Sequence, residues 1–196
     1  MTKIERQKPQ LFEGTTENTG SLEGRSLFEY EQTLGFQKKD LSGKTVLDFG
    51  SGPTERLSRE LKDNNIDANI ISVNPDYKTK RYRDQVTTSP DWQKKSVAAV
   101  GQELPFLDNS FDEVLALYSV SSYVDDRFDQ VLLEIYRILK PGGTARIAPF
   151  MAERLSKNFE KTWKKILPGV NLRIEECDEH WEEGILLRLV FRKPIR

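Results

Sequence analysis

The sequence has very few of the residues that form disulfides and metal centres. Its 196 residues include one cysteine, Cys177, and one histidine, His180. A single cysteine excludes an internal disulfide framework and cysteine-rich zinc sites. A single histidine excludes paired-histidine motifs such as H-E-x-x-H. We therefore expect no metal centre, a packing role for Cys177 and a surface-loop position for His180.

Long apolar runs and an excess of one charge are also missing. No stretch of about 18 apolar residues occurs, and the first ten residues, MTKIERQKPQ, lack the apolar core of a signal peptide. With 30 basic and 31 acidic residues, the net charge of −1 removes the broad electrostatic case for a nucleic-acid coat or a polybasic membrane binder. An apolar content of 37% suits one folded domain. We expect a soluble, cytoplasmic protein with no membrane partner.

The N-terminal region differs in character from the rest of the chain. Residues 1–20 are polar, with Thr, Asn and Gly gathered at the end, which indicates a flexible arm. Residues 21–196 are expected to form a single domain. Within it, residues 21–42 are expected to form a lid that contains a short amphipathic helix ending near Gly35.

From Lys44 onwards, short apolar runs alternate with helical patterns. The apolar runs are TVLDFG, ANIISVN, SVAAV, FDEVLALYSV and GTARIAPF. A charged segment, TERLSRELKD, predicts one helix, and helical spacing from Val124 to Leu139 predicts another. Asp125 or Asp126 can cap the second helix, and Pro141 is expected to stop it. Such alternation indicates parallel strands with helices on both faces.

The C-terminal part follows a different pattern. A helix marked by Phe159 and Trp163 precedes two apolar runs, VNLRIEEC and GILLRLVFRK. The segment between these runs is too short for a crossover helix, so the two strands should pair antiparallel. The predicted fold class is α/β, a Rossmann-like doubly wound sheet of about seven strands, mostly parallel with an antiparallel C-terminal hairpin.

The candidate ligand site is the turn after the first strand, Asp48-Phe49-Gly50-Ser51-Gly52. Glycines there allow positive φ and close approach of a ligand to the backbone. The dinucleotide motif G-x-G-x-x-G fails because Glu55 stands at its third glycine. The P-loop fails because Lys38 stands where its first glycine belongs. Asp48 can either hold the turn by accepting backbone N–H bonds or meet an ammonium group of a ligand.

Four blocks resemble the class I S-adenosylmethionine-dependent methyltransferases, in particular the methyltransferase-domain group that acts on small molecules. They are VLDFGSGP, IISVNPDY, GQELPFLDNSFDEVLALYSV and LLEIYRILKPGGTARI, in the order and spacing of that family. The resemblance covers roughly residues 44–150 and implies S-adenosylmethionine as cofactor.

The resemblance also implies roles for individual residues, at the positions that match the family's pattern. The methionine part of the cofactor would lie at Asp48, Gly50, Ser51 and Gly52. The ribose would meet Asn74, the adenine would lie beside Gly101 and Gln102, and Tyr118 would form the wall towards the substrate.

Three positions depart from the family's pattern. Asn74 replaces a ribose-binding carboxylate, Val100 replaces an acid near the adenine, and Thr54 replaces a third glycine. An amide oxygen still accepts a hydrogen bond, but without the extra strength that a charged acceptor provides. These departures keep a non-catalytic function open for the fold.

The sequence names no catalytic residue, because Ser121-Ser122-Tyr123 offers no obvious base after the fourth strand. The expected function is transfer of a methyl group to a small molecule, with residues 1–42 and 152–167 forming the lid and acceptor pocket. The alternative is a non-catalytic binding or scaffold protein on the same fold. RNA modification through the basic segment Tyr77–Arg83 is a weaker third option.

Overall fold

The computed structural model describes residues 24–52, 54–79, 95–120, 127–153, 155, 159–177 and 184–195. Several sequence predictions fall outside these residues. They concern the arm at residues 1–20, the helix cap at Asp125 or Asp126, the stretch from Ser121 to Tyr123, His180, and the basic segment beyond Thr79.

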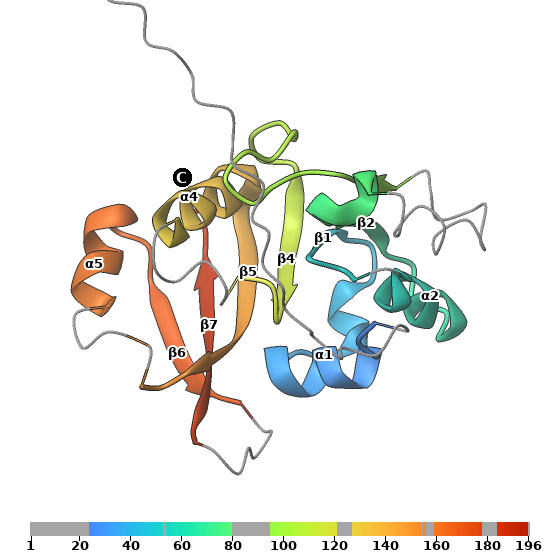
Figure 1. Cartoon of the computed structure of the whole chain (residues 1–196), viewed down its shortest axis with the longest axis horizontal. Coiled ribbons are helices and arrows are strands. Elements are labelled where there is room, and N and C mark those ends of the chain that lie inside the picture. Colours follow the sequence, from blue (N-terminus) through green and yellow to red (C-terminus); the bar gives the residue numbers. More distant parts are fainter. Residues whose placement is uncertain are drawn as a thin grey trace, which may run out of the picture.

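The described strands form one seven-stranded sheet with the order β3-β2-β1-β4-β5-β7-β6 (Figure 1). The strands are β1 Thr45–Phe49, β2 Asn69–Val73, β3 Ser96–Val97, β4 Phe111–Leu117, β5 Leu139–Met151, β6 Leu172–Glu176 and β7 Leu186–Arg192. Strands β1 to β5 pair in parallel. Strand β7 runs antiparallel to both β5 and β6. The predicted fold class, including the antiparallel C-terminal hairpin at the sheet edge, is therefore confirmed.

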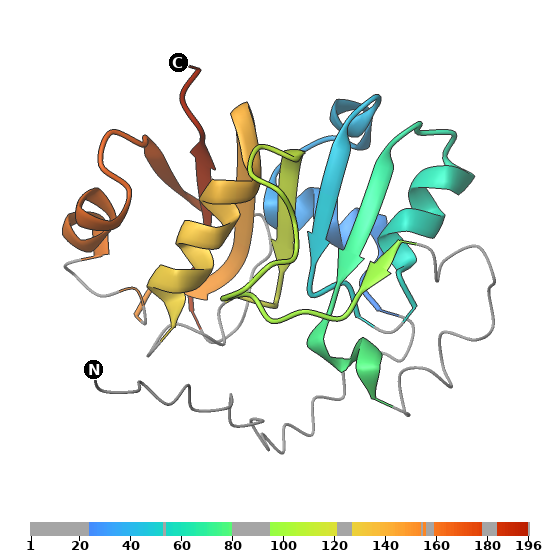
Figure 2. The same ribbon diagram turned by 90° about the horizontal axis from the view of Figure 1, so that it is seen from above.

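Helices cover both faces of this sheet, as the alternating pattern predicted. The helices are α1 Leu27–Leu34, α2 Arg56–Asp63, α4 Phe128–Ile138 and α5 Phe159–Ile166, with short 3-10 turns η1 Lys38–Leu41 and η2 Pro75–Lys78. In Figure 2, α4 lies in front of the sheet and α1 behind it. Strand β4 serves both layers, because Val114 packs in the core with α4 and α5, whereas Leu115 packs in the core with α1 and α2.

The boundary between α4 and β5 differs from the sequence prediction. The helix ends at Ile138, and Leu139 already has extended backbone with ψ 137°. The expected stop signal at Pro141 therefore lies inside β5 and not at the end of the helix. The chain turns early because a residue that precedes proline, here Lys140, disfavours the helical region. The N-cap position of α4 is Arg127, which makes no side-chain capping bond.

Helix α1 is tied to the rest of the fold at both ends. Ser26 and Glu29 form a reciprocal capping box at its N-terminus, and Gly35 ends it with φ 65°. At the other end, Arg146 of β5 donates to the carbonyl of Gly35 at 2.8 Å, and Arg188 of β7 donates to the carbonyl of Gln32 at 3.3 Å. Cations at this end also suit the helix dipole.

Within the described residues, no helix is long and apolar enough to cross a membrane; α4, with 11 residues, is the longest of them.

The arginine that anchors α1 provides a stability prediction. Arg146 also pairs with the buried Glu113 at 3.0 Å, so Arg146→Met leaves that carboxylate with Lys44 as its one ion-pair partner among the described residues and removes one of two donors to the end of α1. We expect a loss of about 2 kcal/mol in the free energy of unfolding, measured by urea denaturation. The control Arg173→Met breaks an exposed ion pair and should change stability by less than about 0.5 kcal/mol. Equal losses in both variants would contradict this anchoring role.

Candidate functional site

The turn after β1 has the geometry that its glycines predicted. Gly50 and Gly52 have φ values of 80° and 71°. The N–H of Gly50 donates to the carbonyl of Val73 at 2.7 Å, which joins this turn to the end of β2. A Cβ on Gly50 would lie 2.2 Å from the Cβ of Ser119, whereas a Cβ on Gly52 would meet, among the described residues, nothing closer than Gly24 Cα at 3.7 Å. The turn is therefore closely packed at Gly50, whereas at Gly52 the described residues leave a side chain no clash.

Asp48 lies fully buried just before the turn. Its Oδ1 accepts a hydrogen bond from the hydroxyl of Tyr30 at 2.6 Å, while its Oδ2 is buried and has no hydrogen-bond partner in the described part of the chain. Burial raises the pKa of Asp48 to about 7, against the lowering effect of the Tyr30 hydrogen bond. One carboxylate oxygen is thus held by α1 and the other remains able to accept from a ligand.

A second buried carboxylate, Glu55, lies after the turn at the N-cap position of α2, with φ 48°. It accepts a hydrogen bond from the hydroxyl of Ser96 on β3. Burial raises the pKa of Glu55 to about 7, and the negative charge of Asp48 adds to this effect. Sequence reasoning used Glu55 only to exclude the dinucleotide motif. In the sequence, the signal that could have identified Glu55 as a site residue is its position directly after a glycine-rich turn.

Asn74 follows β2 directly, at the expected position, but its side chain already has a structural contact. Its Oδ1 accepts from the N–H of Asp76 at 2.9 Å and so caps η2. Tyr77 of η2 reaches back to the glycine-rich turn, where its hydroxyl donates to the carbonyl of Gly52 at 3.0 Å and hydrogen-bonds to the hydroxyl of Ser51. The sequence placed Tyr77 in a basic segment, and its contact with the turn was not predicted.

Gly101 and Gln102 lie in the turn between β3 and β4 and approach the end of β1 through Phe49. A Cβ on Gly101 would lie 2.5 Å from Cζ of Phe49, so only glycine fits there. The side-chain Nε2 of Gln102 is buried without a hydrogen-bond partner. This donor, unpaired among the described residues, is a second buried polar group that a ligand could satisfy.

Tyr118 and Ser119 follow β4 and complete the cluster. Tyr118 has φ 57°, and the guanidinium of Arg25 lies 4.4 Å from the centre of its ring. Ser119 donates through its hydroxyl to the carbonyl of Phe49 at 2.6 Å. The structure therefore brings the residues predicted at β1 and β4 together around Phe49, with the turn at Gly101 against the same side chain.

The start of the described chain lies over the glycine-rich turn and the first turn of α2. Gly24 accepts through its carbonyl from Arg56 at 3.4 Å, and the N–H of Leu27 donates to Glu60 Oε2 at 2.6 Å. Within residues 21–42, Gly24 and Leu27 therefore contact α2 beside the turn, and a lid function stays a prediction. Helix α5 instead packs on the sheet, with Trp163 against Phe191 at 4.9 Å between ring centres. An acceptor pocket at residues 152–167 stays a prediction.

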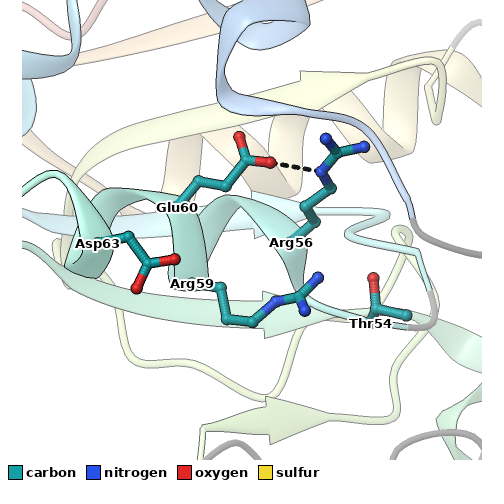
Figure 3. Close-up of a pocket in the computed structure, with 5 residues that line it drawn as sticks. All are labelled: Thr54, Arg56, Arg59, Glu60 and Asp63. Atoms are coloured by element: carbon teal, nitrogen blue, oxygen red, sulfur yellow. Dashed lines mark hydrogen bonds and ion pairs between the residues drawn. The ribbon is translucent and has the colours of Figure 1, made fainter.

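A charged depression lies next to the turn, along α2 (Figure 3). It encloses about 360 Å³ and is lined by Thr54, Arg56, Arg59, Glu60 and Asp63. Arg56 and Glu60 form an ion pair within it. Because neither Asp48 nor Gly50 lines this depression, we place the candidate site at the turn itself. The described part of the chain holds no cluster of three or more potential metal-binding His, Cys, Asp or Glu side chains.

Comparison with known proteins gives relatives with named functions. A ubiquinone/menaquinone biosynthesis C-methyltransferase, UbiE, of Rickettsia typhi is 29% identical over 153 residues, which are 72% of this chain and 61% of that protein. This chain therefore spans about 61% of the length of that relative. A tRNA N(3)-methylcytidine methyltransferase of Schizosaccharomyces pombe is 30% identical over 123 residues, which are 59% of this chain and 39% of that protein.

Solved structures share the fold at low sequence identity. A protein of Methanosarcina mazei, described as a SAM-dependent methyltransferase, superposes with a TM-score of 0.56 and 17% identity over 78% of this chain and 93% of that one. The [4+2]-cyclase SpnF superposes with a TM-score of 0.58 and 15% identity over 86% of this chain and 79% of that one.

Residues 47–147 match the model of a family described as "Methyltransferase domain". This match covers more than half of the chain and contains the glycine-rich turn, the turn at Gly101 and the end of β4. The chain therefore belongs to the methyltransferase-domain family of class I S-adenosylmethionine-dependent methyltransferases.

Proposed function

We propose that this protein transfers a methyl group from S-adenosylmethionine to a small molecule. The observation that carries the proposal is a glycine-rich turn, unobstructed at Gly52 by the described residues, that follows a buried carboxylate whose second oxygen has no partner among those residues. In an open parallel sheet, ligands bind beyond the carboxyl ends of the strands, which is where this turn lies. Family membership and the function named for the Rickettsia relative support the same activity.

The polar groups at the turn fit the chemistry of this cofactor. Its methionine part carries a cationic amino group, which can donate to Asp48 Oδ2, and the backbone at Gly52 allows close approach. Its adenine carries ring nitrogens that can accept from Nε2 of Gln102. The amide oxygen of Asn74 already accepts a hydrogen bond from Asp76. The NH2 group of this side chain is therefore the part best suited to a ribose hydroxyl.

The cofactor supplies a methyl group bound to a positively charged sulfur. The chain's contribution is mainly orientation, because transfer from such a group requires an in-line approach of the acceptor. Tyr118, with its positive φ and its ring beneath Arg25, is placed to form the wall between cofactor and acceptor. We assign no general base.

The relatives favour a small acceptor over RNA. The Rickettsia relative, which aligns over more of this chain than the yeast tRNA enzyme does, is named for quinone biosynthesis. In addition, Tyr77 directs its hydroxyl to the glycine-rich turn. This contact favours a place in the cofactor site over base stacking for that aromatic side chain. A quinone-type ring is therefore the first acceptor class to test.

Calorimetric titration with S-adenosylmethionine and S-adenosylhomocysteine tests the proposal. We expect both ligands to bind. We also expect mass spectrometry to detect transfer of the methyl group to a quinone-type acceptor. Binding of both ligands without transfer to small acceptors or RNA would favour the non-catalytic alternative. Binding of neither ligand would contradict the proposal altogether.

Gly52→Val tests the position of the cofactor. The side chain would enter the room above the turn, so we expect binding of S-adenosylhomocysteine to weaken by at least about tenfold. Gly43→Val is a matched control, because Gly43 has a similar φ of 72° and no described atom within 4 Å of the position of an added Cβ would obstruct it, but it lies before β1. Both variants should lose about 1–2 kcal/mol of stability from left-handed backbone strain. Equal binding by both would contradict the placement.

Asn74→Asp tests the ribose contact. Aspartate caps a turn as well as asparagine does, so the bond to the N–H of Asp76 should persist and thermal stability should stay nearly unchanged. The second carboxylate oxygen could accept from a ribose hydroxyl with a charge-assisted bond. We expect calorimetry to show a few-fold gain in affinity for S-adenosylmethionine. Unchanged affinity would contradict the ribose assignment, because a side chain that contacts a ribose hydroxyl cannot change from donor to acceptor without effect.

A further inference from the structure

The hydrogen bond between Tyr30 and Asp48 joins the helix before the sheet to the cofactor site. Asp48 is 0% exposed and Tyr30 is 2% exposed, so water does not compete for this bond. The distance of 2.6 Å between the hydroxyl and Oδ1 is typical of a hydroxyl that donates to an ionised carboxylate. Tyr30 therefore determines which oxygen of Asp48 is occupied.

Helix α1 holds the Tyr30 hydroxyl in a fixed place. Its first turn is closed by the capping box and by the bond from the Leu27 N–H to Glu60 of α2. Its last turn is held by Arg146 and Arg188, which reach it from two strands of the sheet. With both ends tied, α1 is a rigid element that positions a donor, and not a segment that swings freely.

The second oxygen of Asp48 has no hydrogen-bond partner among the described residues. A buried carboxylate oxygen that accepts no hydrogen bond lowers stability unless a ligand or a proton satisfies it. With Oδ1 held by Tyr30, rotation of the carboxylate is restricted, and Oδ2 keeps one direction. A ligand with a cationic amino group would meet a pre-oriented acceptor there.

We propose that Tyr30 is a positioning residue of the cofactor site, which holds Asp48 so that Oδ2 faces the amino group of S-adenosylmethionine. The inference rests on the function proposed above and extends the site to α1. A site that ended at the family match, residues 47–147, would lack this residue. The role is indirect: Tyr30 acts through Asp48.

This arrangement also makes binding depend on pH. Only ionised Asp48 attracts the amino group, so affinity should rise with pH through the Asp48 pKa of about 7. The Tyr30 hydrogen bond lowers that pKa, so its removal should move the midpoint to higher pH. Three other titratable or charged groups surround this pair: Glu55 at the start of α2, Tyr77 of η2 and Arg25 before α1. All three are the same in the parent chain and in a variant altered only at Tyr30.

The experiment compares Tyr30→Phe with the parent chain by calorimetric titration with S-adenosylhomocysteine between about pH 6 and pH 9. This ligand has the same amino group but is uncharged at sulfur. We expect about tenfold weaker binding at neutral pH, equivalent to about 1.4 kcal/mol, and a midpoint shifted upward. The amino group of the ligand and Glu55 also titrate in or near this pH range. The quantity to compare is therefore the difference between the midpoints of the parent chain and of Tyr30→Phe.

A double-mutant cycle with Asp48→Asn separates positioning from packing. If Tyr30 acts through the carboxylate, Tyr30→Phe should cost little further affinity when Asp48 is already Asn. The matched control Tyr136→Phe alters a tyrosine of α4 whose ring packs beneath Lys193, and it should change neither the affinity nor the midpoint.

The outcomes distinguish this inference from the proposed function. If the parent chain fails to bind S-adenosylhomocysteine at any pH, the proposed function fails. Thermal denaturation shows whether Tyr30→Phe is folded. If the parent binds and the folded variant binds equally well with the same midpoint, the positioning role is wrong. Tyr30→Phe could instead lower the affinity equally in the parent chain and in Asp48→Asn. That result would show that Tyr30 contributes packing only, and would also overturn the proposal.

Discussion

The buried carboxylate of Asp48 is the constraint on which the site depends. A charged group enclosed at the end of a central strand needs partners, and the described chain gives it one, the hydroxyl of Tyr30. This need explains why a helix that precedes the sheet is tied so firmly at both ends. It also explains why the remaining oxygen has chemical value, because a ligand cation can supply what the protein does not.

The sheet order then decides which other residues can meet that ligand. Strand β1 lies between β2 and β4, so its carboxyl end has Val73 on one side and Tyr118 and Ser119 on the other. Phe49 connects these segments, because its backbone carbonyl accepts from Ser119 and its ring lies close to Gly101. Residues that are up to about seventy positions apart in sequence thus surround one turn.

The fold could be predicted from the sequence largely because its strands are short apolar runs with clear glycine and proline boundaries. The position of the turn at Gly50 and Gly52 followed from the same pattern. Tyr30 could not be predicted, because its partner is eighteen residues away and on another element. Glu55 was hidden for a similar reason, since only tertiary packing against Ser96 reveals that it is buried. Helix α4 ends at Ile138, before the predicted end at Leu139, because the restriction that Pro141 places on the preceding residue, Lys140, acts before the proline itself.

A crystal structure of this chain with S-adenosylhomocysteine is the most direct measurement of the central claim. We predict that the ligand lies against Gly50 and Gly52, with its amino group within hydrogen-bond distance of Asp48 Oδ2 and Tyr30 still bound to Oδ1. Ligand bound instead in the depression along α2, or at the turn with its amino group directed away from Asp48, would contradict the claim.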